Sequence, residues 1–244
     1  MMKLISKLTA ILVLAGIFCG IACAITVPGV VVDYYNPANG IYVGGPSIAI
    51  LPNGDYVACH EEYPGQIQTT ILRSTNKGLD WTWVTQLQGQ YESTLFVHKG
   101  VMYLIGGYNN GAGNEYVAIR KSIDGGTNWT APTSTSSGLI TPPATGYNGT
   151  PTPVLVHNGR IWRAFEKVDT TVPAGYSREF RAMVVSAPVD SNLLNASNWT
   201  VSNTLLMGDF IANAGWLEGG VVAAPDGSVK TILRTGWLGK DKAA

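Results

Sequence analysis

The chain has 244 residues, of which 16 are basic and 16 are acidic, so its formal net charge is zero. This balance gives no electrostatic reason to expect nucleic acid or an anionic membrane as a partner. Charged residues make up only 13% of the chain, whereas its 29 glycines and 13 prolines are typical of a chain with many turns.

Residues 1–24 have the pattern of a signal peptide. Two lysines within residues 1–7 precede an apolar run over residues 8–21, and Ala22-Cys23-Ala24 fits an A-x-A cleavage site. We expect cleavage after Ala24 and export of the mature chain to the periplasm or the medium, with no membrane association afterwards. A membrane anchor is the alternative, but the apolar run is short for one. Cleavage would leave Cys59 as the only cysteine, so no intramolecular disulfide is expected.

Four β-hairpins are predicted along the rest of the chain, each from two apolar runs that flank a glycine turn. The turn glycines are Gly54, Gly100, Gly159 and Gly227. A repeat of about 40 to 60 residues that carries four strands is typical of a β-propeller blade. The hairpins place the blade starts near residues 44, 91, 147 and 216, and the last blade is expected to stop after its inner hairpin. No helix is predicted, so the expected fold class is all-β.

One octapeptide pattern, S-x-D/N-x-G-x-x-W, occurs twice, over residues 74–81 and 122–129. Its glycine supplies the positive φ of a tight turn, and its Asp or Asn side chain bonds backbone N–H groups within that turn. Its tryptophan packs the turn onto a sheet. A longer stretch that ends at Asn198-Trp199 resembles a degenerate copy. We expect these turns between the outer strands of the blades.

The octapeptide resembles the Asp-box, or BNR repeat, of the sialidase superfamily. The resemblance covers nearly all of residues 40–235 and is closest to secreted bacterial proteins described as exo-alpha-sialidase-like. It implies a six-bladed propeller, of which about three and a half blades lie in residues 25–244, so a truncated propeller is expected. In this superfamily the site lies on the propeller axis, where the first strand of each blade begins and the second ends.

Tyr, Trp, Glu and Arg side chains concentrate at these axial positions, which suits a sugar ligand. Aromatic faces stack on sugar C–H surfaces, and carboxylates and guanidinium groups bind hydroxyls or an anionic substituent. The catalytic candidates are Glu218, Glu61 and Glu62, and the substrate-binding candidates are Arg234, His60, Tyr91, Arg163 and Trp216. Tyr42, Gly44, Glu92, Tyr108, Tyr147, Asn148 and Glu166 occupy further axial positions.

The segment from Trp216 to Thr235 resembles a sialidase signature in which a Glu opens a strand pair and Arg-Thr closes it. The resemblance implies that Glu218 polarises a tyrosine nucleophile and that Arg234 grips a sialate carboxylate. The first hairpin differs, because Gly44 stands where the family has an arginine and residues 60–65 hold neither an arginine nor an aspartate. A pocket that lacks these arginines should bind sialic acid poorly.

Glu61 and Glu62 remain as candidates for the acid, with Glu218 as the second carboxylate of a glycosidase pair. A structural ion pair between Glu218 and Arg234 would give the same sequence pattern. Arg163 is expected either to pair with Glu166 or to grip a ligand. His98 and His157 recur at one position of two hairpins, which indicates a packing role.

Three functional hypotheses stay open. The first is a secreted sialidase-like glycoside hydrolase that acts on extracellular glycans, with an inactive fragment as an open alternative. The second is a non-catalytic propeller that binds glycans or proteins. The third is a polysaccharide lyase with His60 and Tyr91 at its centre. The sequence contains no metal-ligand cluster, no phosphate-binding loop and no convincing Ser-His-Asp catalytic triad, so no metal or cofactor is predicted. A glycan is the expected partner.

Overall fold

The computed structural model describes residues 29–64, 67–172, 179–205, 215–236 and 242–243. The chain divides into two compact units, Met1–Val30 and Val31–Ala244. The fold described below is that of the second unit, and the expected signal peptide lies outside the described residues. Helix among the described residues consists of two three-residue 3-10 turns, η1 (Pro37–Asn39) and η2 (Ala196–Asn198). None of the described helical segments has the length and apolar character needed to cross a membrane.

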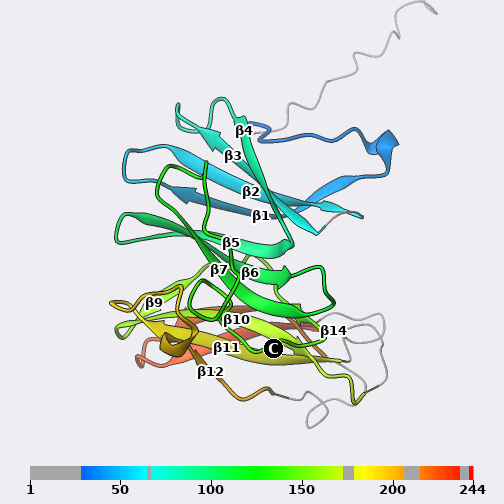
Figure 1. Ribbon diagram of the computed structural model, residues 1–244, viewed down its shortest axis with the longest axis vertical. Coiled ribbons are helices and arrows are strands. Elements are labelled where there is room, and N and C mark those ends of the chain that lie inside the picture. Colours follow the sequence, from blue (N-terminus) through cyan, green and yellow to red (C-terminus); the bar gives the residue numbers. More distant parts are fainter. Residues whose placement is uncertain (1–28, 65–66, 173–178, 206–214, 237–241, 244) are drawn as a thin grey trace, which may run out of the picture. The chain divides into compact units, whose positions relative to one another are not determined.

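The strands form four antiparallel sheets that follow one another along the chain (Figure 1). The first sheet contains β1 (Tyr42–Ile50), β2 (Tyr56–Tyr63), β3 (Gln68–Ser74) and β4 (Thr82–Gln88), and the second contains β5 (Gln90–His98), β6 (Val101–Asn109) and β7 (Glu115–Ser122). The third contains β8 (Tyr147–Asn148), β9 (Leu155–His157), β10 (Arg160–Val168), β11 (Phe180–Pro188) and β12 (Thr200–Val201). The fourth contains β13 (Gly215–Ala223), β14 (Val229–Gly236) and β15 (Lys242–Ala243). The prediction of an all-β chain is confirmed.

All four predicted hairpins form, as β1–β2, β5–β6, β9–β10 and β13–β14. Two of them turn through a pair of left-handed residues, Lys99-Gly100 and Asn158-Gly159. Consecutive left-handed residues are the signature of the type I′ turn, whose twist matches that of the flanking strands. The turn chemistry that the sequence displays therefore fixes the register of the inner strand pairs.

The sheets differ from the expected blade pattern in two places. The second sheet has three strands, and beyond β7 the chain adds only isolated bridges at Leu139 and Ala144. Three prolines between residues 131 and 143 cannot donate to a strand ladder, so a regular fourth strand does not form there. The fourth sheet was expected to stop after its inner hairpin, which is wrong, because β15 pairs with β14 and covers part of its edge.

The two octapeptides form closely similar turns, one between β3 and β4 and one directly after β7. In the first, the Ser74 hydroxyl accepts from Gly78 N–H at 2.8 Å, the Asn76 side chain accepts from Asp80 N–H at 2.9 Å, and the Trp81 indole donates to the Gly78 carbonyl at 3.1 Å. The second repeats these bonds at Ser122, Asp124 and Trp129, at 2.9, 2.9 and 2.8 Å. The hydrogen bonds predicted for the motif are therefore present in both copies.

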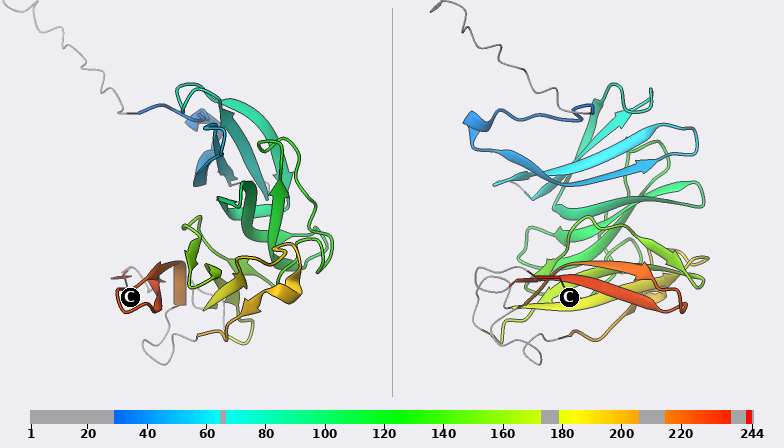
Figure 2. Two further views of the ribbon diagram at one scale, coloured as in Figure 1. Left: turned by 90° about the vertical axis from the view of Figure 1, so that its left-hand side faces the viewer. Right: turned by 180° about the vertical axis from the view of Figure 1, so that it is seen from behind.

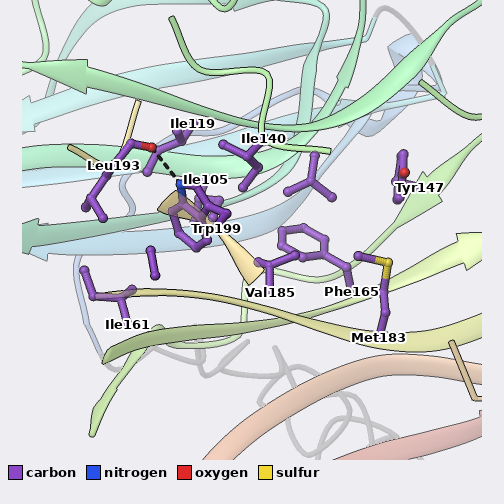
Figure 3. Close-up of a cluster of buried hydrophobic side chains, with 12 residues drawn as sticks. Ile105, Ile119, Ile140, Tyr147, Ile161, Phe165, Met183, Val185, Leu193 and Trp199 are labelled. Carbon is purple, nitrogen blue, oxygen red and sulfur yellow. Dashed lines mark hydrogen bonds between the residues drawn. The ribbon is translucent and has the colours of Figure 1, made fainter. Parts of the chain in front are cut away.

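A buried apolar cluster joins the second sheet to the third (Figure 3). Its members are Ile105, Val117, Ile119, Ile140, Tyr147, Ile161, Phe165, Met183, Val185, Ala187, Leu193 and Trp199. The Trp199 indole donates to the Leu193 carbonyl at 2.8 Å, as the dashed line in Figure 3 shows. The degenerate copy of the octapeptide thus places its tryptophan in the core and anchors it to a nearby carbonyl.

Two further clusters join the remaining sheets in the same way. One, around Val57, Ile71 and Leu104, lies between the first and second sheets, and a smaller one of Ala182, Trp216 and Leu233 lies between the third and fourth. Figure 2 shows the β13–β14 hairpin beside β10 and β11 in both views. Each sheet therefore packs face to face with the next, as the blades of a propeller do.

His98 and His157 connect neighbouring sheets at the hairpin tips. His98 Nε2 lies 2.7 Å from the carbonyl of Val189 in the third sheet's region, and His157 Nε2 lies 2.9 Å from the carbonyl of Gly227 in the fourth hairpin turn. The packing role predicted for both residues is confirmed.

Substitution of Ile119 tests the packing between the second and third sheets. Ile119 is 0% exposed and Ile123, four residues later, is 82% exposed. We expect Ile119→Ala to lower the free energy of unfolding by about 3 kcal/mol, because it leaves a cavity in the cluster, and Ile123→Ala to change it by less than about 0.5 kcal/mol. Chemical denaturation of both variants measures the difference, and equal losses would contradict the packing described here.

Candidate functional site

A β-bulge lies on the inner strand of three sheets, at matching positions. Strand pairing is interrupted after Gly44, Tyr91 and Leu217. The residue that follows each of them has a left-handed backbone conformation, and these residues are Gly45, Glu92 and Glu218. The φ angles are 57° for Gly45, 47° for Glu92 and 57° for Glu218. Left-handed conformations are uncommon outside glycine and cost about 1–2 kcal/mol, and bulges commonly re-aim a side chain.

Glu92 and Glu218 are therefore equivalent residues of the second and fourth sheets. Each carries a carboxylate on a strained backbone position, and such strain clusters at functional sites in proteins. The first sheet has Gly45 there instead, and a Cβ on Gly45 would lie 2.8 Å from Glu61 Oε2. The glycine thus leaves room for the carboxyl group of the neighbouring strand.

Glu61 lies on β2, opposite Gly44, and is 3% exposed. Its Oε1 accepts a hydrogen bond from Ser93 N–H at 3.2 Å, and its Oε2 lies 2.7 Å from the Tyr63 hydroxyl. Burial raises the pKa of Glu61 to about 8, and the nearby Glu92 carboxylate adds to the rise. Glu61 is therefore a neutral carboxylic acid at pH 7.

Glu92 shares the same tyrosine. Its Oε1 also lies 2.7 Å from the Tyr63 hydroxyl. Burial raises the pKa of Glu92 and the charge of Glu218 raises it further, whereas the Tyr63 bond and the Arg163 guanidinium lower it. Glu92 thus stands between the first sheet and the charged residues of the third and fourth.

The third sheet reaches the same region through a split inner strand. Strands β8 and β9 both pair with β10, and the residues between them bind a fully buried Arg163. The Arg163 guanidinium donates to the Thr152 hydroxyl at 2.8 Å, to the Ala164 carbonyl at 2.6 Å and to the Thr150 carbonyl. Burial lowers the pKa of Arg163 to about 10, which still leaves it charged at neutral pH.

The ion pair expected between Arg163 and Glu166 is not among the ion pairs of the described residues. Glu166 instead accepts from Asn148 Nδ2 at 2.8 Å and from Gly219 N–H at 3.0 Å. Burial raises the pKa of Glu166 to about 7. Of the two roles left open for Arg163, the ion pair with Glu166 is therefore not formed, because the Thr150 and Ala164 carbonyls and the Thr152 hydroxyl accept from the terminal guanidinium nitrogens instead.

Glu218 and Arg234 form an ion pair, with Arg234 Nη1 donating to Glu218 Oε1 at 2.8 Å. Their side chains are 36% and 34% exposed, so the pair faces partly to solvent. The sequence placed these two residues together, and the structure does so as well. The alternatives of a catalytic carboxylate and a structural ion pair share this geometry.

Glu62 points away from this group, because side chains alternate along a strand. Its Oε1 accepts from the Tyr35 hydroxyl at 2.7 Å and from Gln86 Nε2 at 3.3 Å. His60, two residues earlier, lies on the same face, and its Nε2 is 2.8 Å from Asp33 Oδ2. Glu62 and His60 therefore have other hydrogen-bond partners than Glu61.

Tyr91 and Trp216 have structural partners. The Tyr91 hydroxyl lies 2.6 Å from Glu115 Oε2 and 2.8 Å from the Tyr147 carbonyl, which ties the second sheet to the third. Trp216 is 6% exposed and packs in the apolar cluster between the third and fourth sheets. Trp216 was expected among the substrate-binding residues, and packing of the fourth sheet on the third buries its side chain.

Two cavities lie beside the axial residues. One, of about 400 Å³, is lined by Glu61, Glu62, Tyr63, Ile67, Gln68, Tyr91, Glu92, Glu115, Thr145, Gly146, Tyr147, Asn148, Val168 and Phe180. The other, of about 720 Å³, is largely apolar and is bordered by His60, Ser47 and Phe96 among others. His60 and Tyr91 thus border different cavities, and the structure does not bring them together as the lyase hypothesis requires.

Sequence reasoning placed Glu92 and Glu166 at axial positions without giving them a catalytic or binding role, and it did not single out Tyr63. Glu92 follows Tyr91 at the bulge position that Glu218 holds in the fourth hairpin, so an alignment of the two hairpins at their bulges identifies it. Tyr63 gave no such signal, because its role depends on a carboxylate from another sheet. Among the described residues, no group of three or more His, Cys, Asp or Glu side chains could hold a metal ion.

Comparisons with known proteins show the type of fold. No protein-family model and no curated protein matches the sequence. A solved alpha-L-arabinanase of Penicillium chrysogenum, complexed with arabinobiose, is similar, with a TM-score of 0.54 and 17% identity over 86% of this chain and 61% of its own. An alpha-L-arabinofuranosidase of Fusarium graminearum, bound to an iminosugar inhibitor, has a TM-score of 0.57 and 14% identity over 87% of this chain and 60% of its own.

A Trypanosoma rangeli sialidase in complex with sialic acid is also similar, with a TM-score of 0.52 and 12% identity over 80% of this chain and 29% of its own. The chain spans about three fifths of the two arabinan-related enzymes and less than a third of the sialidase. At these identities the likeness concerns the fold, which is all-β and β-propeller-like and which this chain shares with glycoside hydrolases.

The buried carboxyl of Glu61 predicts a specific dependence of stability on pH. Its pKa is about 8 in the folded chain against 4.5 for a free side chain, so the folded state retains a proton that the unfolded state loses. This contribution to stability is complete below pH 4.5 and is lost as the pH rises to about 8. We expect Glu61→Gln to remove a slope of up to about 1.4 kcal/mol per pH unit over this window.

Urea denaturation at pH 5, 6, 7 and 8 measures this slope. Asp226→Asn is the control, because the Ser228 hydroxyl lowers the pKa of Asp226 and both folded and unfolded forms are ionised throughout. Parallel curves for the wild type and Glu61→Gln would show that Glu61 is ionised in the folded chain.

Proposed function

We propose that the protein is an exported glycoside hydrolase that acts on extracellular glycans and cleaves at an uncharged sugar. The proposal includes a sialidase-like propeller of six blades, to which the four described sheets belong, and a signal peptide at residues 1–24. The resemblance of the octapeptide turns and the fold of the solved glycoside hydrolases support this assignment.

The observation that carries the proposal is a group of glutamates from three sheets, in which Glu61 and Glu92 share the Tyr63 hydroxyl and Glu218 lies near Glu92. Glycosidases use one neutral carboxylic acid to protonate the leaving group and one ionised carboxylate to assist at the sugar. Burial keeps Glu61 neutral to about pH 8. Glu218, held by Arg234 and partly exposed, supplies the carboxylate. Glu61 is therefore the proposed proton source, and Glu62, whose carboxylate binds Tyr35, is not.

The charge of the cavity favours an uncharged sugar. Four glutamates line the cavity of about 400 Å³, and no lysine or arginine is among the described residues that line it. Repulsion between a sugar carboxylate and this group of acidic side chains would oppose binding of sialic acid. Three tyrosines of the same lining offer aromatic faces for sugar C–H surfaces. The arabinobiose bound to the Penicillium enzyme is an example of a ligand with the required chemistry.

A non-catalytic glycan-binding propeller is the second candidate. The ion pair between Glu218 and Arg234 favours it, because this pair would serve a structural role in the same geometry. The lyase hypothesis receives no such support, since His60 binds Asp33 and Tyr91 binds Glu115.

Hydrolysis of a panel of 4-nitrophenyl glycosides, including an α-L-arabinofuranoside and a sialoside, tests the proposal. We expect activity on an uncharged glycoside and none on the sialoside. Loss of the acid or of the carboxylate, in Glu61→Gln or Glu218→Gln, should lower kcat by about 10² to 10⁴. Asp190→Asn is the control, because Asp190 pairs with Lys99 at the surface. A protein that hydrolyses no glycoside but retains glycans on an array would be a binding propeller.

A further inference from the structure

The Tyr63 hydroxyl touches two carboxyl groups but carries a single proton. Its oxygen lies 2.7 Å from Glu61 Oε2 and 2.7 Å from Glu92 Oε1. A phenol donates one hydrogen bond, so it can serve only one of the two carboxylates. If both carboxyl groups were ionised, the other contact would press a carboxylate oxygen against a phenol oxygen without a proton between them. A second proton must therefore be present in this three-residue bridge.

The second proton belongs on Glu61 and on one particular oxygen. Glu61 is almost completely buried, whereas Glu92 is partly exposed. Glu61 Oε1 already accepts a hydrogen bond from Ser93 N–H, so we place the proton on Oε2, the oxygen that faces Tyr63. Burial raises the pKa of both carboxyl groups, but the Arg163 guanidinium lowers the pKa of Glu92 alone and so favours its ionised form. Glu61 thus donates to the Tyr63 oxygen, and the Tyr63 hydroxyl donates to the Glu92 carboxylate.

Tyr63 itself stays protonated. Burial, together with its hydrogen bonds to the Glu61 and Glu92 carboxyl groups, raises its pKa well above the ordinary value for tyrosine. A tyrosinate is therefore not a stable state of the bridge, and a proton that arrives at the oxygen from one side must leave on the other. A hydrogen-bonded chain of this kind moves protons without moving heavy atoms.

Charged groups on the surrounding strands influence which carboxyl group of the bridge is ionised. Glu218 of β13 faces Glu92 and disfavours its charge, Arg163 of β10 favours it, and Arg234 of β14 neutralises Glu218. Glu61 also faces the Cys59 thiol, whose pKa burial raises, so that this thiol remains neutral. Tyr91, whose hydroxyl binds Glu115, borders the same cavity. Occupation of that cavity by an uncharged sugar would displace water from Glu92 and make its neutral form more favourable.

We propose that Tyr63 is a positioning residue that relays a proton from Glu61 to Glu92, so that Glu92 is the group that presents the acid proton to the ligand. In the relay the Glu61 O–H bond breaks as the proton moves to the Tyr63 oxygen, while the original Tyr63 O–H bond breaks as its proton moves to Glu92. Glu61 ends ionised, Glu92 ends neutral and Tyr63 is unchanged, so protons and charge balance. The catalytic role of the relay rests on the function proposed above, but the bridge itself does not.

The bridge can be tested without any substrate. Carboxyl-carbon NMR shifts of ¹³C-glutamate-labelled protein, assigned with Glu61→Gln and Glu92→Gln, give the titration midpoint of each group. We expect Tyr63→Phe to raise the Glu61 midpoint by about one pH unit, a tenfold change in its ionisation constant, because the ionised form loses a hydrogen bond. Glu92→Gln should lower the same midpoint, because a neighbouring negative charge is removed. An unmoved Glu61 midpoint in Tyr63→Phe overturns the bridge.

The relay is tested with whichever glycoside the wild type hydrolyses. Tyr63→Phe should lower kcat by about 10² with KM changed less than about threefold, since the relay acts on proton transfer and not on binding. The alkaline limb of the pH profile should move with the Glu61 midpoint. Tyr103→Phe is the matched control, because Tyr103 stacks on Phe96 and contacts neither carboxyl group. An unchanged kcat in Tyr63→Phe overturns the relay.

The two proposals fail in different ways. A wild-type protein that hydrolyses no glycoside counts against the proposed function before any variant is measured, and it removes the catalytic role of Tyr63 with it. The NMR titration then still decides whether Tyr63 joins Glu61 and Glu92. Circular dichroism of Tyr63→Phe excludes unfolding as the cause of either result.

Discussion

Face-to-face packing of consecutive sheets is the constraint on which the rest of this structure depends. The site residues come from all four sheets, with Glu61 on the first, Glu92 on the second, Arg163 on the third and Glu218 on the fourth. Residues of different sheets meet only because the apolar clusters hold the sheets together. Ile119 and Phe165 belong to the cluster that joins the second and third sheets, and Trp216 belongs to the one that joins the third and fourth. The octapeptide turns contribute at the other end of the strands, where Trp81 and Trp129 fix the outer loops.

The inner strands then convert this packing into a polar site. A bulge in three of the sheets turns one residue into the left-handed region, and in two sheets that residue is a glutamate. The glycine that takes this place in the first sheet leaves space for Glu61. Burial of Glu61 and Glu166 keeps their pKa values near or above neutrality, while Arg163 remains charged near Glu166 and Glu92. A site with both neutral and ionised carboxyl groups follows from this geometry.

Much of the fold could be predicted, because its signals are local. Alternating apolar residues around Gly54, Gly100, Gly159 and Gly227 gave all four inner hairpins, since turn chemistry and alternation act within about ten residues. The pairing of β15 was not foreseen, because an edge strand of two residues has no periodicity. In the site, the contact of Glu218 with Arg234 was foreseen from their places in one hairpin. Trp216 was placed wrongly, because its burial depends on the third sheet.

The sequence by itself determined the four inner hairpins and their turns, because these follow from short-range backbone chemistry. Only the tertiary structure decided between Glu61 and Glu62, by directing one toward Tyr63 and the other toward Tyr35. It also decided the protonation state of Glu61, which depends on burial and on a carboxylate that arrives from the second sheet. Charge and solvation act through space, so the protonation states and hydrogen-bond partners of these residues are set only when the sheets pack together.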